Sequence, residues 1–267
     1  MQLEILMAAY NNYNVMKLVF DGYINQTDKD FLLTVADDGS TPEIKNLCDI
    51  YTKKGLKIKH VWHEDIGYRR ATILNKALRE STSDFIVFTD NDCVPHPKFI
   101  ADHKKNAQEG YFSIGRRCDL KDEISNKLLT QEIHLDCLFN PIFLIFQSLR
   151  NRLKRPECAI SLPTFICLFL QIKNIKALGA NMGVWKKDLF AINGFDNKFQ
   201  GYGFEESDLE NRLIKSGVTG KSIKGKAGLV HLYHPERSVS DESLLLFQAR
   251  SKNQNVKVKD GIYNLNN

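Results

Sequence analysis

The first 90 residues alternate between short apolar runs and longer segments that carry apolar residues at helical spacing. The apolar runs predict strands at 3–9, 31–36, 56–62 and 85–89, and the spaced segments predict helices at 15–24, 42–55 and 69–80. Strands that alternate with helices in this way form a mostly parallel sheet covered by helices on both faces. In such sheets, ligands bind at the carboxyl ends of the strands. The sequence therefore predicts an α/β fold and indicates where a site would lie.

The composition is that of one ordinary globular domain. The chain has 267 residues, of which 43% are hydrophobic and 26% are charged, and this is enough for one large core. No linker rich in Pro, Gly or Ser and no repeat divides it. We expect a single domain over 1–237 and a C-terminal tail over 238–267, which is polar from about Ala249 and is expected to be loosely held.

The net charge of +5 is modest, and the basic residues gather in two places. These are Arg150, Arg152, Lys154 and Arg155, and then Lys215, Lys221, Lys224 and Lys226. Each cluster is either a solvated basic face or a surface that attracts phosphate or anionic lipid. The chain has no basic stripe with interleaved aromatic residues, so we expect no nucleic-acid partner.

The six cysteines are scattered and include no Cys-x-x-Cys pair, which argues against a zinc site or a disulfide framework. The N-terminal segment reads as a strand and lacks the basic region and cleavage site of a signal peptide. We therefore expect a reducing, cytoplasmic location.

Two apolar runs in the middle of the chain allow two interpretations. They are LFNPIFLIFQSL at 138–149 and LPTFICLFL at 162–170, and the basic RNRLKR lies between them. Both are shorter than the ~20 residues that a membrane-spanning helix needs. The first interpretation is a buried core helix. The second is a surface within 138–170 that lies in the bilayer interface with its basic residues on lipid headgroups, which would place the chain peripherally on the inner face of the plasma membrane.

The segment Asp90-Asn91-Asp92 follows the fourth predicted strand. Two carboxylates beside an apolar strand need a partner, and oxygen ligands suit Mn²⁺ or Mg²⁺. His231 and His234 lie three residues apart in VHLYHP, and two imidazoles at this spacing can complete a metal shell. The alternative is an ordinary surface turn and two unrelated histidines.

The segment GYGFEESD at 201–208 combines two glycines, an aromatic residue and an acidic helix start. Glycines allow a ligand to approach the backbone closely, and the ring of Tyr202 offers an apolar face to a sugar. A carboxylate here could deprotonate an acceptor hydroxyl, whereas the alternative is simple capping of the helix over 205–215.

Polar residues also follow the second and third predicted strands. Asp37 and Asp38 lie in DDGS, which is either a turn or a contact for a nucleotide base and ribose. Arg69 and Arg70 stand at the start of a predicted helix, where they either hold a diphosphate or carry surface charge.

Together and in this order, these motifs resemble those of the family 2 glycosyltransferases with the GT-A fold. The C-terminal half is similar to β-1,4-galactosyltransferases and to bacterial enzymes of the chondroitin-polymerase type. The motifs that carry the resemblance are VADDGS, GYRRATILNKAL, FTDNDCVPHP, GANMGVWKKDLFAINGFD, GYGFEESDL and HLYHP. The resemblance implies a nucleotide-binding half over 1–110, an acceptor and membrane-proximal segment over 111–176, and an acceptor and catalytic half over 177–237.

The resemblance also implies a role for each candidate residue. Asp92, His231 and His234 would ligate the metal, and Glu206 would be the catalytic base. The nucleotide part of the donor would meet Asp37, Asp38, Arg69, Arg70, Asp90 and Asn91. The sugar or acceptor would meet Tyr202, Glu205, Asp208, Asn181 and Trp185. The family usually has Asp where this chain has Glu206, so either the backbone compensates for the extra methylene or Glu205 shares the task.

The implied reaction is inverting transfer of a sugar from a UDP-sugar, with Mn²⁺ or Mg²⁺, to a glycan or lipid-linked acceptor of a surface polysaccharide. Galactose or N-acetylgalactosamine is the first expectation for the sugar. One alternative is a sugar-nucleotide binding protein without transferase activity. Another is a nucleotidyltransferase, which would need a Gly-rich basic loop after the first strand, where this chain reads AAYNNYN.

Overall fold

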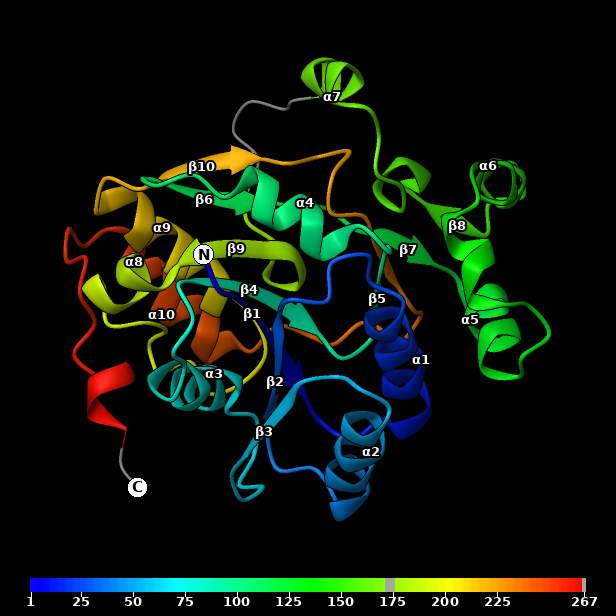
Figure 1. The fold of residues 1–267 in the computed structure, drawn as a ribbon. Helices are drawn as coiled ribbons and strands as arrows, with labels where there is room; N and C mark the ends of the chain where they lie inside the picture. Colours follow the sequence, from blue (N-terminus) through cyan, green and yellow to red (C-terminus); the bar gives the residue numbers. More distant parts are fainter. Residues whose placement is uncertain (171–175, 266–267) are drawn as a thin grey trace.

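A computed structural model describes residues 1–170 and 176–265, and a seven-stranded sheet forms its centre (Figure 1). The strands lie in the order β10-β6-β9-β4-β1-β2-β3. Their bounds are β1 Leu3–Ala9, β2 Leu32–Asp37, β3 Ile58–Trp62, β4 Phe85–Asp90, β6 Tyr111–Ile114, β9 Met182–Trp185 and β10 Thr219–Ser222. The four N-terminal strands are parallel, and β9 runs antiparallel to β4 and β6. The mostly parallel α/β sheet is therefore as predicted.

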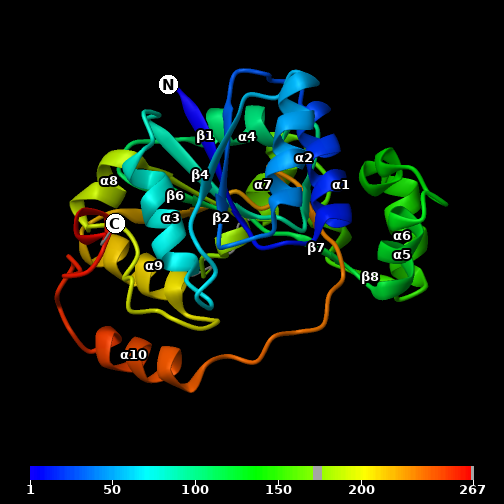
Figure 2. The same cartoon turned by 90° about the horizontal axis from the view of Figure 1, so that it is seen from below.

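Helices cover both faces of this sheet. The bounds of the described α-helices, including those that lie away from this sheet, are α1 Tyr13–Ile24, α2 Pro42–Lys53, α3 Arg70–Arg79, α4 Phe99–Asn106, α5 Asp122–Leu129, α6 Pro141–Leu149, α7 Thr164–Leu170, α8 Lys186–Ala191, α9 Glu205–Lys215 and α10 Asp241–Ser251. In β1, Leu3, Ile5 and Met7 pack in one core with α1 and α2, while Leu6 and Ala8 pack in the other with α3 and α9. Figure 2 shows these two layers on opposite sides of the strands. The alternation follows from the two-residue period of a strand.

A second, smaller sheet was not predicted from the sequence. Its strands lie in the order β5-β11-β7-β8, with β5 at Cys93–Pro95, β11 at Leu229–His231, β7 at Cys118–Leu120 and β8 at Leu153–Lys154. Strands of two or three residues are too short to show a two-residue period in the sequence. This sheet matters because it brings the region after β4 next to the region around residue 231.

The prediction of a loosely held tail is wrong. Val258 and Ile262 are buried, and Ile262 packs in the same core as α3. The side chain of Asn193 donates a hydrogen bond of 2.9 Å to the carbonyl of Val258. The segment is mostly polar, but Val258 and Ile262 attach it to residues that lie far away in the sequence.

The structure tests the first interpretation of the run at 138–149, a buried core helix. In α6, Leu144 is buried, but Ile142 is 80% exposed and Leu149 is 81% exposed. The interpretation of a buried core helix is therefore wrong for α6. The described part of the chain contains no helix that is long and apolar enough to span a membrane.

Candidate active site

The pairing of β5 with β11 explains how Asp92 meets two histidines that lie far away in the sequence. Asp92 lies between the end of β4 and the start of β5, and Cys93 of β5 is paired with His231 of β11. The Nε2 atom of His231 lies 3.5 Å from Oδ2 of Asp92, and the Nε2 atom of His234 lies 3.3 Å from the same oxygen. The structure therefore brings together the three residues that the sequence predicted as metal ligands.

The chemistry of this cluster fits a divalent cation. One ligand atom from each of Asp92, His231 and His234 lies within 4.8 Å of the others. The Nε2 atom of His231 is buried and has no hydrogen-bond partner among the described residues, a condition that a bound ion would relieve. Burial opposes ionisation of Asp92, yet its close contacts with the two histidines hold the pKa of its carboxyl below the usual range. A carboxylate with two imidazoles suits Mn²⁺ among other divalent metals.

Cys93 lies beside this cluster but does not fit the role of a ligand. Its Sγ atom is 3.3 Å from Oδ1 of Asp92, and burial raises the pKa of its thiol well above the ordinary value. Soft thiolate ligands suit Cu(I), Zn²⁺ and Fe–S clusters rather than Mn²⁺ or Mg²⁺. The candidate metal ligands are therefore a carboxylate oxygen of Asp92 and the ring nitrogens of His231 and His234.

Asp119 is a residue of the site that the sequence analysis missed. It lies on β7, in register with His231 of the parallel strand β11, and its Oδ1 is 3.4 Å from Nδ1 of His231. Arg117 also holds Asp119, through an Nε–Oδ1 contact of 3.0 Å, and Arg155 pairs with its other oxygen. A carboxylate on the far nitrogen of a metal-binding histidine fixes the ring and its tautomer. The only signal in the sequence is one acidic residue inside the short apolar segment Cys118–Leu120.

Arg70 lies at the centre of a group of carboxylates. Its Nη2 donates a hydrogen bond of 2.9 Å to Oδ1 of Asp90, and its Nη1 pairs with Glu206 and lies 3.6 Å from Oε1 of Glu205. Arg117 approaches the other oxygen of Asp90 at 3.7 Å. Arg70 therefore connects the acidic start of α9 with the Asp-x-Asp segment, and a diphosphate would compete with these carboxylates for its guanidinium.

The two glutamates at the start of α9 differ in access. Glu205 is 3% exposed, accepts hydrogen bonds of 3.1 Å from the Tyr68 hydroxyl and from the Gly203 amide, and is therefore engaged in holding the loop. The side chain of Glu206 is 21% exposed. Burial is the main cause that raises the pKa of Glu206 to about 7; Arg70 opposes this shift, and the charges of Glu205 and Asp90 add to it. A base with a pKa near 7 is matched to proton transfer at neutral pH.

The structure also accounts for the extra methylene of Glu206 relative to the usual Asp. A Cβ atom placed on Gly179 would lie 2.2 Å from Oε1 of Glu206. The missing side chain at Gly179 is therefore what gives the longer carboxylate its room. The ring of Tyr202 is 41% exposed and lies 6.2 Å from that of Tyr68, at the rim of the same group.

Of the residues predicted to meet the nucleotide, the acidic residues and Asn91 lie at the ends of β2 and β4, and Arg69 and Arg70 lie at the start of α3. Asp37 is buried and accepts hydrogen bonds from the Ser40 amide at 2.8 Å and from His60 at 2.7 Å. Asp38 lies 2.6 Å from His63 and accepts a hydrogen bond of 2.9 Å from the amide of Arg69.

Two further predicted nucleotide contacts bond to the protein backbone. The guanidinium of Arg69 binds the carbonyl of Glu64, and Asn91 donates a hydrogen bond of 3.2 Å to the carbonyl of Asn11. The histidines that partner Asp37 and Asp38 were not foreseen.

Two predicted sugar contacts are engaged in the core. Asp208 is 2% exposed and forms an ion pair of 2.7 Å with Arg212, so a contact with a sugar would cost this pair. Asn181 is fully buried, pairs with His103 at 3.0 Å, and donates to the carbonyls of Arg116 and Ala227. Both side chains stabilise the scaffold around the site.

Trp185 is separated from the rest of the predicted residues. It is paired with Phe85, at the first residue of β4, whereas Asp90 is the last residue of that strand. Five residues of strand span ~17 Å. The antiparallel direction of β9 therefore places Trp185 at the opposite end of the sheet, and the structure does not bring it to the candidate site.

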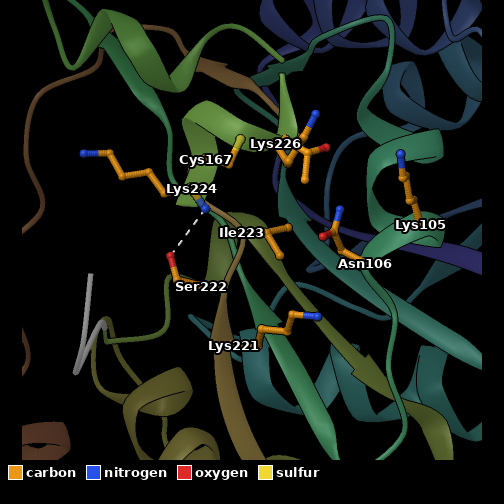
Figure 3. A pocket seen from close by; sticks show the side chains of 9 residues that line it. Lys105, Asn106, Cys167, Lys221, Ser222, Ile223, Lys224 and Lys226 are labelled. Atoms are coloured by element: carbon orange, nitrogen blue, oxygen red, sulfur yellow. Dashed lines mark hydrogen bonds between the residues drawn. The ribbon is translucent and has the colours of Figure 1, made fainter. Parts of the chain in front are cut away.

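A separate hollow lies between α4, α7 and the segment after β10 (Figure 3). Its lining includes four lysines, Lys105, Lys221, Lys224 and Lys226, and none of the predicted site residues. Figure 3 shows that these side chains do not converge on one point, and Lys224 pairs with Glu157 at 3.1 Å. The hollow is basic but lacks the convergent donors of a built anion site.

Comparison with known families assigns the two parts of the chain. The model described as "Glycosyl transferase family 2" matches residues 4–171, and the one described as "N-terminal domain of galactosyltransferase" matches residues 168–235. The first match contains the Asp-x-Asp segment, and the second contains Glu206 and both histidines.

Two relatives and one solved structure are similar to most of the chain. Chondroitin synthase of Escherichia coli is 25% identical over 252 residues, which are 88% of this chain and 34% of that protein. Validoxylamine A glucosyltransferase of Streptomyces hygroscopicus subsp. jinggangensis is 29% identical over 261 residues, which are 91% of this chain and 58% of that protein. The chain thus spans about a third and just over half of these relatives.

The crystal structure of GalNAc-T7 with UDP, GalNAc and Mn²⁺ superposes with a TM-score of 0.61 at 11% identity, covering 93% of this chain and 47% of that one. At this identity the likeness concerns the fold alone. It confirms the expected GT-A architecture.

Proposed function

The chain belongs to glycosyl transferase family 2 and is a glycosyltransferase; on that premise, we propose that it moves a sugar from a UDP-sugar to a hydroxyl group with inversion and with a divalent cation. Family membership disfavours both earlier alternatives, the binding protein without activity and the nucleotidyltransferase. The proposed acceptor is a glycan or lipid-linked chain of a surface polysaccharide, in keeping with the chondroitin synthase relative. Galactose or N-acetylgalactosamine is the proposed sugar. The proposed nucleotide-binding half is 1–110, the proposed acceptor and membrane-proximal segment is 111–176, and the proposed acceptor and catalytic half is 177–237.

The observation that carries the proposal is the meeting of Asp92, His231 and His234 at the carboxyl end of the sheet. The described structure of GalNAc-T7 contains UDP and Mn²⁺, which supports the same pair of ligands here. Asp92, His231 and His234 would hold the cation, whose positive charge would offset the negative charge on the departing diphosphate. The side chain of His234 is 40% exposed, so the cluster is open to solvent at this residue.

We assign the proton transfer to Glu206. It is the more exposed of the two glutamates, and Arg70 connects it to Asp90, two residues from Asp92. In the proposed reaction, Oε1 or Oε2 of Glu206 accepts the proton of the acceptor hydroxyl while that oxygen attacks the anomeric carbon from the face opposite the diphosphate. The bond from the anomeric carbon to the phosphate oxygen breaks, and the electron pair leaves with UDP. Position and charge stabilisation supply most of the barrier reduction.

A donor screen tests the proposed function. The protein is incubated with Mn²⁺ and a panel of UDP-sugars, and release of UDP by slow hydrolysis is measured. We expect hydrolysis of UDP-galactose or UDP-N-acetylgalactosamine, and its loss when a chelator removes the metal. Hydrolysis that is the same with and without the chelator would contradict the proposed metal dependence.

We predict that Asp119→Asn weakens metal binding without preventing folding. Asp119 is a positioning residue, because it touches His231 and not the proposed ion. Loss of a carboxylate behind a metal-binding histidine typically costs ~10- to 100-fold in metal affinity. Calorimetric titration of Mn²⁺ in the presence of UDP measures this change. The matched control is Asp136→Asn, since Asp136 also pairs with a histidine, His134 at 3.1 Å, but is 74% exposed there. Equal Mn²⁺ affinities of Asp119→Asn and the control would contradict the assignment.

The rate of transfer should depend on pH through Glu206. Its pKa is raised to about 7, and only the ionised carboxylate can accept a proton, so kcat/KM for the acceptor should rise with pH and level off above 7. Below that pKa, the rate should fall about tenfold for each pH unit. Donor and Mn²⁺ are kept saturating, and Mn²⁺–UDP binding is measured at each pH, so that a loss of metal binding is distinguished from protonation of the base. If kcat/KM for the acceptor stays constant as the pH is lowered from 7 to 6 while Mn²⁺–UDP binding is intact, Glu206 is not the titrating base.

A further inference from the structure

One face of α6 is both apolar and exposed. Ile142 is 80% exposed, Ile145 59%, Phe146 46% and Leu149 81%. These positions follow the i, i+3, i+4, i+7 spacing that places side chains on one side of a helix. Leu144 on another side is buried and fixes the helix to the body of the protein. The exposed face is thus a continuous apolar stripe, in contrast to the scattered single apolar residues that are normal on a protein surface.

Basic residues adjoin the end of this stripe. Residues 138–155 contain four arginines and lysines and no acidic residue. Arg152 pairs with Glu123, and Arg155 pairs with Asp119. Arg150 and Lys154 are exposed and have no carboxylate partner among the described residues. The guanidinium of Arg150 lies 3.8 Å from the ring centre of Phe146, so positive charge and apolar surface are in direct contact.

We propose that α6 docks on an anionic membrane surface, with its apolar stripe in the interface and with Arg150 and Lys154 on the lipid headgroups. A stripe this narrow beside unpaired cations has the form of an interfacial helix. Negative headgroups offer the complementary charge that the described residues do not supply.

The position of α6 in the fold determines where the candidate metal site would lie relative to the membrane. Figures 1 and 2 both show α5 and α6 at the edge of the molecule. The strand after α6 is β8, in which Lys154 is paired with Asp119 of β7, the residue that touches His231. A docked α6 would therefore hold the candidate metal site near the lipid surface. If the proposed function is correct, this position favours an acceptor carried on a lipid.

Vesicle sedimentation tests the docking without any use of activity. The protein is mixed with vesicles of phosphatidylcholine and phosphatidylglycerol, and separately with vesicles of phosphatidylcholine alone. Two variants probe the surface, Ile142→Ser with Leu149→Ser for the stripe and Arg150→Gln with Lys154→Gln for the charge. Two controls replace exposed side chains elsewhere, Ile66→Ser with Leu245→Ser, and Lys53→Gln with Lys57→Gln.

We expect the protein to bind the anionic vesicles, with the partition coefficient reduced at least ~10-fold in the stripe variant. The charge variant should lose about fivefold for each basic residue. Both controls should bind as the original protein does, and all variants should keep its melting temperature. Binding that does not depend on the anionic lipid, or that survives both probe variants, would overturn the proposal. A dimer that the stripe variant abolishes would also overturn it, by assigning the stripe to a second copy of the chain. The donor screen is unaffected by either result.

Discussion

Asp92→Asn should abolish Mn²⁺ binding and lower the rate of transfer by ~10³-fold or more, because a cation at the diphosphate contributes several kcal/mol to transition-state stabilisation. The substitution keeps the shape of the side chain but removes the charge that both histidines face, at 3.5 and 3.3 Å. Calorimetry with Mn²⁺ and UDP measures binding, and UDP release measures turnover.

The control for this experiment is Asp122→Asn, which removes an exposed carboxylate in the first turn of α5. We expect the control to bind Mn²⁺ and turn over as the original protein does. An Asp92→Asn protein that still binds Mn²⁺ with unchanged affinity would show that the ion lies elsewhere.

Glu206→Gln should lower transfer by ~10²- to 10⁴-fold while Mn²⁺ and UDP still bind, because general-base catalysis contributes on this scale. The amide keeps the length and hydrogen-bonding capacity of the side chain but cannot accept the proton. The melting temperature and Mn²⁺–UDP affinity are measured beside the rate, so that a folding defect is recognised. Equal rates for Glu206→Gln and the original protein would remove Glu206 from the mechanism.

Two further variants locate the base more sharply. Gly179→Ala adds a methyl group 2.2 Å from Oε1 and 2.5 Å from Cγ of Glu206, so the side chain of Glu206 must shift while the backbone around it is not contacted. We expect Gly179→Ala to fold normally and to lose ~10²-fold in rate, since a carboxylate displaced by about 1 Å is misplaced for the reaction. Glu205→Gln distinguishes the two glutamates: a larger loss in this variant than in Glu206→Gln, with folding intact, would transfer the role to Glu205.

The main sheet was predictable because its signals are local. The strands and helices of the first 90 residues lie within about two residues of their predicted bounds, and α9 begins and ends where it was expected. The spacing of apolar residues that predicts each of these elements lies within the element itself, so no distant partner is needed to recognise it. The tail was mispredicted for the opposite reason, since Val258 and Ile262 are isolated apolar residues that depend on distant partners such as Asn193.

Site residues that lie in sequence motifs were predictable. Site residues whose position depends on the pairing of strands were not. Asp92 and the two histidines stand out by residue type and spacing, and the structure brings them together. Asp119 was missed because its relation to His231 arises only from the pairing of β7 with β11. Trp185 lies in a recognisable motif, but the direction of its strand takes it to the far end of the sheet.

The sequence also left open whether α6 is buried or has an exposed apolar face. A run such as LFNPIFLIFQSL is apolar enough for either a buried or an interfacial helix, and only the packing of Leu144 decides which side faces the protein. The same ambiguity applies to any short apolar segment with no strong polar face.

The measurement that tests the central claim most directly is pulsed electron paramagnetic resonance of Mn²⁺ bound to the protein with UDP. If Asp92, His231 and His234 hold the ion, the spectrum will show hyperfine coupling to imidazole nitrogen from two histidines, and this coupling will fall to that of one histidine in His234→Gln. A bound Mn²⁺ whose spectrum shows no histidine nitrogen, or one that His234→Gln leaves unchanged, would contradict the account.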